Sequence, residues 1–500
     1  MDKEDLKLFT QPSSLLILNK VSKLLTEQGI KSYLVGGFVR DVLLGRDTVD
    51  IDIAVAEDAL EVAPRIATAF GGRYVLLDEV NRVGRVILAS EGATKDEWQI
   101  DFTTLEGTIE QDLAQRDFTI DAMAVNLGEL EEDNTAMQLI DPFDGWGDLH
   151  RGVIRTVLPN AFKSDAGRLL RAVRLAAELG FSIDTKTETL IQRHCHLIAS
   201  VAGERIRDEL LRLLAIPQRK LLPYLDELGL LTAIIPELNQ LKGVKQPKEH
   251  FWDVFEHSIR TVVAVDFLLN EGEWEYASEE VLGAVPWSAT LAHHFDQEVS
   301  SGSNRRSLIK LAALLHDIAK PQAKAIDEGG RMRFLGHARE GADIATNIME
   351  RLRFSGKEVR LVETMVRYHL RPGQMSHDEL PSPRAIYRYF RDTGEAGIDV
   401  LFLSLADHLA TRGPRLILAR WQEHAQMVEY VLAQRFLEGG LVVPPKLIDG
   451  HDLINVFGMR PGPKVGQLLE AVREAQAVGE LTTRQEALTY VREKLAANVV

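Results

Sequence analysis

Three aspartates stand on segments whose side-chain alternation predicts β-strands. In residues 49–55, aliphatic residues alternate with Asp50 and Asp52, so both carboxylates are expected on one face of a strand. Asp101 is flanked by apolar residues in a second predicted strand, 98–104, and is also expected to face away from the core. Adjacent carboxylates repel each other unless a cation lies between them, and Mg²⁺ prefers hard oxygen ligands together with substrate phosphates. The pattern predicts two Mg²⁺ ions that activate a hydroxyl and stabilise departing pyrophosphate, although Asp-x-Asp alone more often lies on a solvated edge strand.

A glycine pair precedes these aspartates. Gly36 and Gly37 follow a predicted strand, 31–35, and open a short predicted helix. Bare backbone N–H groups at such a turn can hold a triphosphate, and Arg40 can add a charge-assisted contact one turn later. A Gly-Gly turn is common and mostly structural, but its place about a dozen residues before Asp-x-Asp is much less common.

Further motifs follow in order. They are RDFTIDAMA at 116–124, DAGRLLRAVR at 165–174 and GERI at 203–206. Together with the glycine pair and the aspartates, the chain resembles class II tRNA nucleotidyltransferases and bacterial poly(A) polymerases, which belong to the polymerase β-like nucleotidyltransferase superfamily. The resemblance covers residues 31–245 well and the C-terminal region more loosely. It implies an α+β protein: an N-terminal polymerase β-like domain with a mixed sheet, then an all-α neck and body, an all-α HD domain and a helical C-terminal region.

The resemblance also assigns roles to individual residues. It makes Asp50 and Asp52 the Mg²⁺ ligands and Asp101 a third carboxylate. Contacts to the nucleotide fall to Gly36, Gly37, Arg40 and Arg116, and Asp117 is expected to brace the site. Two positions depart from the family pattern: Ser164 stands where Glu is frequent, and Asp121 stands where Asn is usual.

A predicted helix over 165–179 carries polar residues at every third position. These are Asp165, Arg168, Arg171 and Arg174, and the resemblance implies that all four bind the nucleotide. Asp165 and Arg168 can share a face, and the resemblance makes them the pair that reads the nucleobase. A carboxylate accepts a hydrogen bond and a guanidinium only donates, so this pair favours an amine beside an unprotonated ring nitrogen. Cytosine and adenine present that pattern, whereas uracil and guanine present its reverse, so CTP and ATP are the expected substrates. Without the resemblance, a solvated basic helix face is the simpler interpretation.

A second group of residues follows the order of an HD-type metal phosphohydrolase. Its members are His257, His316, Asp317, His337, His369 and Asp407. Imidazoles and carboxylates together bind divalent transition metals and activate water. A single His-Asp pair is weak evidence, because buried histidines often serve only as hydrogen-bonded core residues. The other histidines of this region, His250, His293, His294 and His408, are expected to be surface or core residues.

These groups need a scaffold of several domains. Strands are also predicted at 83–89 and 137–140, and helices at 185–199, 203–215 and 218–229. Expected boundaries give a catalytic head at 1–150, a helical neck and body for nucleotide recognition and RNA binding at 151–245, an HD domain at 246–415 and a helical RNA-binding tail at 416–500. Residues 270–306 are polar and predict an inserted or loosely ordered connection.

Charge is distributed unevenly along the chain. Residues 1–150 hold 13 Lys/Arg against 29 Asp/Glu, residues 151–245 hold 15 against 10, and the remainder holds 30 against 35. The basic surplus of the middle segment is where an RNA backbone would be attracted. No run of eighteen apolar residues exists, the N-terminus is acidic, and Cys195 is the single cysteine, so a cytoplasmic protein without a membrane span is expected.

Three functions remain open at this stage. The first is addition of CMP and AMP to the tRNA 3′ end, as the whole CCA or only CC or A. The second is poly(A) synthesis, against which the chain lacks a strongly basic tail. The third is an HD phosphohydrolase with a non-catalytic head, against which the intact Asp50 and Asp52 pair argues.

Overall fold

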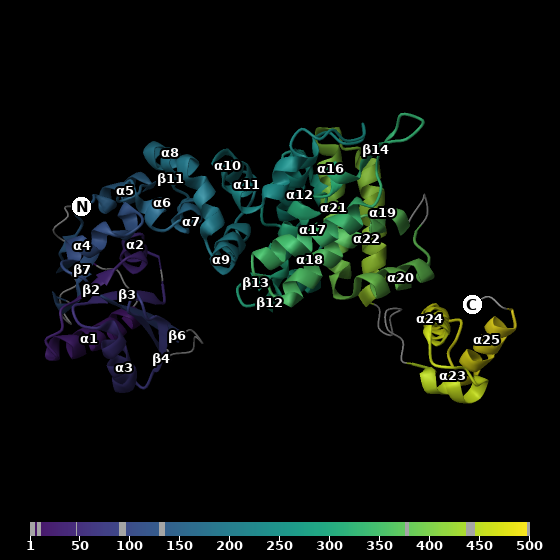
Figure 1. Ribbon diagram of the computed structural model, residues 1–500, viewed down its shortest axis with the longest axis horizontal. Helices are drawn as coiled ribbons and strands as arrows, with labels where there is room; N and C mark the ends of the chain where they lie inside the picture. The colour runs from purple at the N-terminus through teal and green to yellow at the C-terminus, as the bar shows by residue number, and fades with distance from the viewer. Residues whose placement is uncertain are drawn as a thin grey trace. The chain divides into compact units, whose positions relative to one another are not determined.

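The computed structural model describes residues 6–7, 12–46, 48–89, 97–129, 136–375, 380–436 and 446–497 (Figure 1). Two compact units divide the chain. One comprises Met1–Val201 with Leu228–Leu230, and the other comprises Ala202–Glu227 with Leu231–Val500. The unit boundary at Val201 lies within the predicted neck and body, so the proposed four-part division of the chain is finer than this division into two.

The first unit contains a seven-stranded sheet with the order β4-β5-β6-β3-β2-β7-β9. Its strands are β2 (Ser32–Val35), β3 (Asp50–Val55), β4 (Arg73–Asp78), β5 (Val83–Ala89), β6 (Glu97–Thr104), β7 (Ala124–Asn126) and β9 (Leu139–Ile140). Only β3 and β6 pair in parallel, and the other neighbours are antiparallel. The mixed sheet confirms the expected α+β head. Strands β4 and β7 were not predicted, because β4 is mostly half-exposed and β7 has only three residues.

The two central strands show the predicted alternation. Ile51 and Ile53 of β3 and Ile100 and Phe102 of β6 are at most 1% exposed, whereas the intervening polar side chains are more accessible. Helix α3 (Ala59–Phe70) packs on β5 and β6 and buries its own apolar face there. Burying this side of the sheet forces the aspartates onto the opposite side, because side chains alternate along a strand.

Short helices complete the first unit. They are α1 (Pro12–Glu27), α2 (Gly37–Leu43), α4 (Ile109–Ala114), α5 (Gly145–Arg151), α6 (Ala161–Ser164), α7 (Arg168–Leu179) and α8 (Thr185–His194). The predicted helix 165–179 begins only at Arg168. Asp165 lies before it in extended backbone (φ −147°, ψ 109°) and accepts a 2.9 Å hydrogen bond from the Gly167 N–H. Such a local side-chain bond competes with helix formation.

The second unit is helical along most of its described length. Its longer helices are α9 (Gly203–Leu214), α12 (Val254–Leu268), α15 (Arg305–Leu315), α17 (His337–Arg351), α18 (Gly356–Tyr368), α20 (Pro383–Thr393), α21 (Gly397–Arg412) and α22 (Leu418–Phe436). The shorter α10 (Leu221–Glu227), α16 (Lys320–Ala323) and α19 (Arg371–Met375) connect them. Near the C-terminus, α23 (Gly450–Phe457), α24 (Pro463–Ala477) and α25 (Arg484–Ala496) bury a separate cluster that includes Leu453, Leu468 and Val491.

The expectation of a loosely ordered connection at 270–306 is wrong. This segment contains α13 (Glu279–Gly283), α14 (Ala289–Asp296) and the paired strands β12 (Glu298–Ser300) and β13 (Ser303–Asn304). Ser278 and Ser288 cap the two helices through hydrogen bonds to backbone N–H groups, and Phe295 is fully buried. Polar composition misled the interpretation because several of the polar residues are caps.

Among the described residues, no helix is both long and apolar enough to cross a membrane.

A buried lysine anchors α15, the helix that ends next to His316. The Lys310 ammonium lies 2.7 Å from a carboxylate oxygen of Asp266, 2.7 Å from one of Glu271 and 2.8 Å from the Leu214 carbonyl oxygen, and the side chain is 0% exposed. Removing one partner of a buried ionic group leaves the others uncompensated.

We therefore predict that Lys310→Met lowers the free energy of unfolding by about 3–5 kcal/mol. Urea-induced unfolding of the full chain measures this loss. The matched control is Lys324→Met, which removes an exposed lysine of the same unit and should change stability by less than about 0.5 kcal/mol. Equal stability of the two variants would contradict the anchoring role of Lys310.

Candidate active site and metal centre

The register between β3 and β6 brings the candidate carboxylates of the first unit together. Asp52 is directly opposite Asp101 in the parallel pair, and Asp50 lies two residues before Asp52 on the same face. Asp50 is exposed at the start of β3, and the other two are half-buried. The predicted grouping of three acids from two strands is therefore present.

The environment of Asp52 shows the cost of this grouping. The pKa of Asp52 is raised to about 6, chiefly by burial and also by the nearby charges of Asp101 and Asp121. The guanidinium groups of Arg116 and Arg171 oppose this effect and lower the pKa. Carboxylate oxygens crowded in this way are the hard donors that Mg²⁺ prefers, so the residues present fit a divalent cation at Asp50 and Asp52.

Asp101 already has a partner that the sequence did not reveal. Arg85 of β5 is opposite Asp101 in the antiparallel register and donates to both of its oxygens, from Nε at 2.7 Å and Nη2 at 2.8 Å. Such a bidentate pair is strong and directional. Because both oxygens are engaged, the role of Asp101 as a third metal ligand stays a prediction and requires Arg85 to release it. The positions alone could not pair these residues, since pairing depends on strand order.

Gly36 has a backbone conformation and close neighbours that favour a residue without a side chain. Its φ of +69° is in the region that favours glycine. A Cβ added there would lie 2.7 Å from Nη1 of Arg116 and 3.1 Å from a carboxylate oxygen of Asp52. The absent side chain therefore leaves the room in which Arg116, which also pairs with Asp112 at 3.2 Å, approaches Asp52.

A buried ion-pair network braces this side of the site. Arg40 donates to Asp121 at 2.6 Å and to Asp41 at 2.9 Å, and Arg171 lies 2.7 Å from Asp117 and 3.6 Å from Asp121. Although burial acts to lower it, the neighbouring carboxylates hold the pKa of Arg40 above its usual range. The bracing role expected for Asp117 agrees with this geometry. Nucleotide contacts by Arg40 and Arg171 stay predictions, since both guanidinium groups are paired here.

The expected base-reading residues occupy different surroundings. Asp165 and Arg168 flank the start of α7, and Arg168 donates to the Gln115 carbonyl at 2.8 Å. Arg174 is instead buried and pairs with Glu178 at 2.6 Å within the same helix. The structure thus supports Arg174 as a packing residue, and its nucleotide contact stays a prediction.

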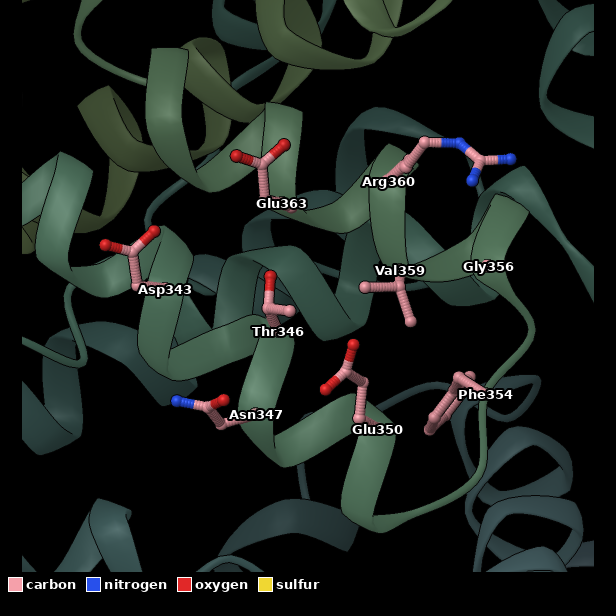
Figure 2. A pocket seen from close by; sticks show the side chains of 9 residues that line it. All are labelled: Asp343, Thr346, Asn347, Glu350, Phe354, Gly356, Val359, Arg360 and Glu363. Atoms are coloured by element: carbon pink, nitrogen blue, oxygen red, sulfur yellow. The ribbon is translucent and has the colours of Figure 1, made fainter.

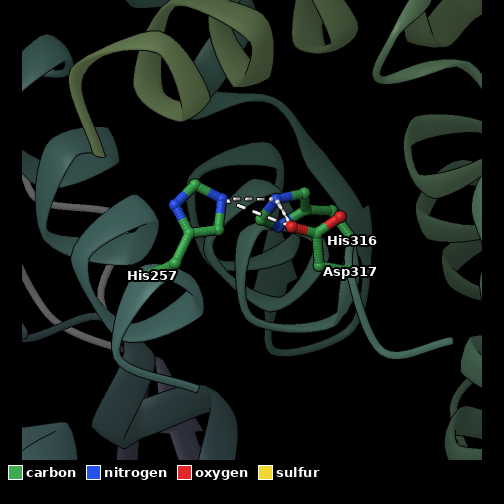
Figure 3. A group of neighbouring side chains, drawn as sticks. All are labelled: His257, His316 and Asp317. Atoms are coloured by element: carbon green, nitrogen blue, oxygen red, sulfur yellow. Dashed lines mark hydrogen bonds and ion pairs between the residues drawn. The ribbon is translucent and has the colours of Figure 1, made fainter. Parts of the chain in front are cut away.

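In the second unit, all six candidate metal ligands meet. His257 on α12 lies 3.2 Å from His316, nitrogen to nitrogen, and 3.4 Å from Asp317 (Figure 3). Asp317 in turn lies 3.3 Å from His337 and 3.8 Å from His369, and Asp407 is 3.1 Å from His257. Two triads are close enough to hold a divalent ion, and they share Asp317: His257, His316 and Asp317, and Asp317, His337 and His369.

Backbone carbonyls orient three of these imidazoles. Nδ1 of His316, His337 and His369 lies 2.8, 2.6 and 2.7 Å from the carbonyl oxygens of Ala313, Phe334 and Val366 respectively. A carbonyl only accepts, so each Nδ1 carries the proton and each Nε2 is left with a lone pair directed at the cluster. This arrangement is typical of histidines that bind metal, and the residues present fit a divalent ion.

Lys320 also belongs to this cluster, although it was not singled out in the sequence. Its ammonium lies 2.6 Å from Asp317 and 2.6 Å from the Gln246 side-chain oxygen. Burial acts to raise the pKa of Asp317, but His316 and Lys320 hold it well below its usual range. The spacing of Lys320, three residues after Asp317 at the start of α16, was the available signal.

Of the remaining histidines, His250 lies beside this cluster, and His293 and His294 do not belong to it. The His250 ring centroid is 5.4 Å from that of His257, and burial lowers the pKa of His250 to about 3. His294 instead pairs with Asp399 at 3.2 Å, and His293 is exposed.

A separate hollow of about 560 Å³ between α17 and α18 holds several acids, as Figure 2 shows. Arg367 pairs with two of them, Asp343 and Glu363, and no histidine lines the hollow.

Four family models match segments of the chain. The model described as the Poly A polymerase head domain matches residues 32–155, and that described as the probable RNA and SrmB-binding site of polymerase A matches 180–242. The HD domain matches 254–412, and the model described as 'tRNA nucleotidyltransferase domain 2 putative' matches 445–491.

Relatives match along most of the chain. The A-adding tRNA nucleotidyltransferase of Deinococcus radiodurans is 34% identical over 92% of this chain and 94% of its own. The CC-adding tRNA nucleotidyltransferase of Thermus thermophilus is 32% identical over 92% and 93%. The CCA-adding enzyme of Geobacillus stearothermophilus is 35% identical but covers 43% of this chain and 53% of its own.

Solved structures share the fold. A CCA-adding enzyme in complex with ATP superposes with a TM-score of 0.62 at 23% identity, covering 97% of this chain and 95% of its own. The Thermotoga maritima CCA-adding enzyme complexed with tRNA gives 0.57 at 22% identity, covering 97% and 96%.

The surroundings of Gly36 generate a prediction with a matched control. Gly45 has nearly the same φ, +68°, but a Cβ there would meet nothing within 4 Å. Gly36→Ala and Gly45→Ala therefore introduce similar backbone strain of about 1 kcal/mol. Only Gly36→Ala should displace Arg116 and Asp52, and it should weaken CTP binding by about tenfold through the altered charge-assisted contacts. Calorimetric titration with CTP measures this, and equal CTP affinity of both variants would show that Gly36 does not shape the site.

Proposed function

Because the chain belongs to the tRNA nucleotidyltransferase family, we propose that it transfers CMP or AMP from CTP or ATP to the 3′ end of tRNA, building or repairing the CCA end. The observation that carries this proposal is the paired register of Asp52 and Asp101, with Asp50 beside them and the Gly36 turn behind. The intact carboxylates argue against a head that has lost catalysis.

The proposed reaction is nucleotidyl transfer at these carboxylates. The terminal 3′-hydroxyl of tRNA releases its proton to solvent as its oxygen forms a bond to the α-phosphorus, and the bond from that phosphorus to pyrophosphate breaks. Asp50 and Asp52 would hold Mg²⁺, which would supply a Lewis acid for this transfer. Arg116 lies beside Asp52, where it can offset the negative charge that develops on the departing pyrophosphate.

Base selection is assigned to the start of α7. The Gly167 N–H donates to Oδ1 of Asp165 and orients a carboxylate that accepts from an exocyclic amine. Arg168 donates to an unprotonated ring nitrogen. UTP and GTP reverse both partners and leave polar groups desolvated and unpaired, at about 1–3 kcal/mol each.

The names of the relatives that match most of this chain support a partial product, either CC or A. The relatives from Deinococcus radiodurans and Thermus thermophilus match nine-tenths of this chain and are named for adding A and for adding CC, whereas the CCA-adding relative from Geobacillus stearothermophilus matches less than half. We propose on this ground that the chain adds one part of the CCA end.

We also propose how the chain divides, with RNA binding assigned to the neck and body and to the tail. We propose four parts: the head at 1–150, the neck and body at 151–245, the HD domain at 246–415 and the tail at 416–500. The basic surplus of the neck and body supports contact with the tRNA backbone. The cytoplasm, where tRNA and nucleotides meet, is the proposed location.

The deciding experiment combines acceptors with triphosphates. Transcribed tRNAs ending at the discriminator base, at C or at CC are each incubated with one labelled triphosphate and Mg²⁺. A CC-adding enzyme extends the first two with CTP alone, and an A-adding enzyme extends only the third with ATP. UTP and GTP should be incorporated at least about tenfold more slowly, given the pairing cost above.

Asp50→Asn and Asp52→Asn should each lower the extension rate by at least about a thousandfold, because the metal-bound charge stabilises the transition state, and should leave tRNA affinity unchanged. Near-normal extension by either variant would place the metal elsewhere. Extension of an unrelated RNA into a long A tail would instead support a poly(A) polymerase. Complete CCA addition to the first acceptor would reject a partial product.

The six-residue cluster of the second unit favours a second activity. We propose that the HD domain binds a divalent transition metal and hydrolyses a phosphoester, with the lone pairs of the oriented imidazoles and Asp317 as ligands. A metal bound there supplies the activated water.

We expect His316→Ala to lower the bound metal of the full chain by at least about tenfold and to abolish phosphoester hydrolysis, while tRNA extension is kept. Elemental analysis after dialysis measures the metal, and p-nitrophenyl phosphate reports hydrolysis. His293→Ala, which removes an exposed histidine of the same unit, is the control. If the wild-type chain binds no stoichiometric metal, the cluster is a structural element of the fold and not a metal site.

A further inference from the structure

Helix α20 carries three arginines on one face. Arg384, Arg388 and Arg391 recur at spacings of four and three residues, which places them along a single stripe of the helix. On the opposite face, Ile386 and Phe390 are buried within the second unit. The three arginines, called here the arginine row, therefore form the outward side of an amphipathic helix.

Glutamates of the C-terminal helices cover the arginine row. Nε and Nη2 of Arg388 lie 3.0 and 2.6 Å from the two carboxylate oxygens of Glu474 on α24, which is a bidentate pair. Nη1 of Arg391 lies 2.9 Å from a carboxylate oxygen of Glu470, also on α24. Arg391 pairs in addition with Asp392 of its own helix at 2.7 Å.

The contact extends to both ends of the arginine row. Nη2 of Arg384 lies 2.6 Å from a carboxylate oxygen of Glu480, just after α24. The Tyr387 hydroxyl donates to Glu470 at 3.3 Å. Its pKa is raised to about 12, chiefly by burial and then by the charge of Glu470, so the hydroxyl keeps the proton that it donates. Each arginine of the row thus has a glutamate partner between 79 and 96 positions later in the chain.

Charge holds this contact, and no shared apolar core supports it. The apolar cluster of α23, α24 and α25 draws all of its members from residues 447–495, so these helices bury their apolar side chains without α20. The three arginine side chains are 37–52% exposed. Ion pairs at this exposure contribute little stability and are screened by salt. A competing polyanion can therefore displace the glutamates.

An RNA strand offers the same chemistry as these glutamates. The guanidinium fork matches the oxygens of a phosphate as well as those of a carboxylate. A nucleic-acid backbone also repeats its negative charge at short intervals, and neutralising several phosphates at once releases counterions. Three arginines in a line suit such a repeating charge better than they suit a single small anion.

We propose that the arginine row of α20 is a binding surface for the phosphate backbone of RNA, and that Glu470, Glu474 and Glu480 occupy it in place of phosphates until RNA displaces them. The proposal rests on the tRNA binding proposed above and adds a site to it. Docking of α24 and binding of the RNA backbone at α20 exclude each other.

Two triple variants of the full chain separate this role from that of a structural joint. Both variants break the same ion pairs, but only the first keeps the arginine row. They are the glutamate variant Glu470→Gln/Glu474→Gln/Glu480→Gln and the arginine variant Arg384→Gln/Arg388→Gln/Arg391→Gln. Fluorescence anisotropy measures the affinity of each for a transcribed tRNA ending at CC, at salt concentrations from about 50 to 200 mM.

We expect the glutamate variant to bind tRNA at least about tenfold more tightly than the wild type, and the arginine variant to bind no more tightly than the wild type. The slope of log Kd against log salt should be smaller by about 2–3 in the arginine variant than in the glutamate variant, because each phosphate contact contributes about 0.7–0.9.

A matched control makes the same change of net charge elsewhere in the second unit. Glu328→Gln/Glu429→Gln/Glu493→Gln removes three exposed glutamates away from the arginine row. It should bind tRNA within about twofold of the wild type, because salt screens charges that lie far from the bound strand.

Equal tRNA affinities of the glutamate and arginine variants make the contact a structural joint and overturn the proposal, even where the wild type extends tRNA. A gain that the control variant reproduces overturns it as well. An arginine-dependent gain in a chain that extends no tRNA keeps the RNA surface and rejects the proposed activity. Circular dichroism checks the fold of each variant. If a triple variant does not fold, Glu474→Gln and Arg388→Gln are compared in the same way.

Discussion

The head is organised around carboxylates that the fold forces together. Apolar residues of β3 and β6 must be buried on one face of the sheet, and the strand period then places Asp52 opposite Asp101 on the other. Like charges at this separation destabilise the folded chain unless they are compensated. Arg116 and Arg85 supply positive charge beside these carboxylates, and the absence of a side chain at Gly36 leaves room for Arg116.

The second unit also buries a carboxylate whose charge must be compensated, and it does so with different side chains. Asp317 is buried among imidazoles and beside the Lys320 ammonium, and helix ends hold the imidazoles through backbone carbonyls. Because imidazole can be neutral, the candidate metal ligands of this cluster can be buried together and oriented in advance. Around Asp52 and Asp101 the compensating groups are instead the guanidinium groups of Arg116 and Arg85, which keep their positive charge.

Asp121 shows how a departure from the family pattern is accommodated. Where Asn is usual, this chain has a buried carboxylate whose two oxygens approach Arg40 and Arg171. A neutral amide would leave two guanidinium groups with less compensation in a buried setting. The aspartate therefore belongs to the bracing of the site, and it connects the turn after α4 to helix α7, where base reading is assigned.

Local patterns were sufficient for much of this protein. The alternation in 49–55 and 98–104 determined which face the aspartates take, because that face depends only on the strand period and on burial. The order of histidines and acids likewise predicted a cluster that the fold assembles. Periodicity was less reliable at helix ends: Asp165 lies outside α7 because its side chain bonds a backbone N–H, and in 270–306 the polar caps resembled a loop.

Tertiary structure alone decided the partners of these groups. Arg85 meets Asp101 only because β5 and β6 are neighbours in register, and Arg40 meets Asp121 across 81 positions of sequence. An ion pair depends on which side chains come within a few ångströms, and long-range packing sets that distance. The sequence by itself therefore determined the chemistry available, and the fold decided which charges are neutralised and which are left for a ligand.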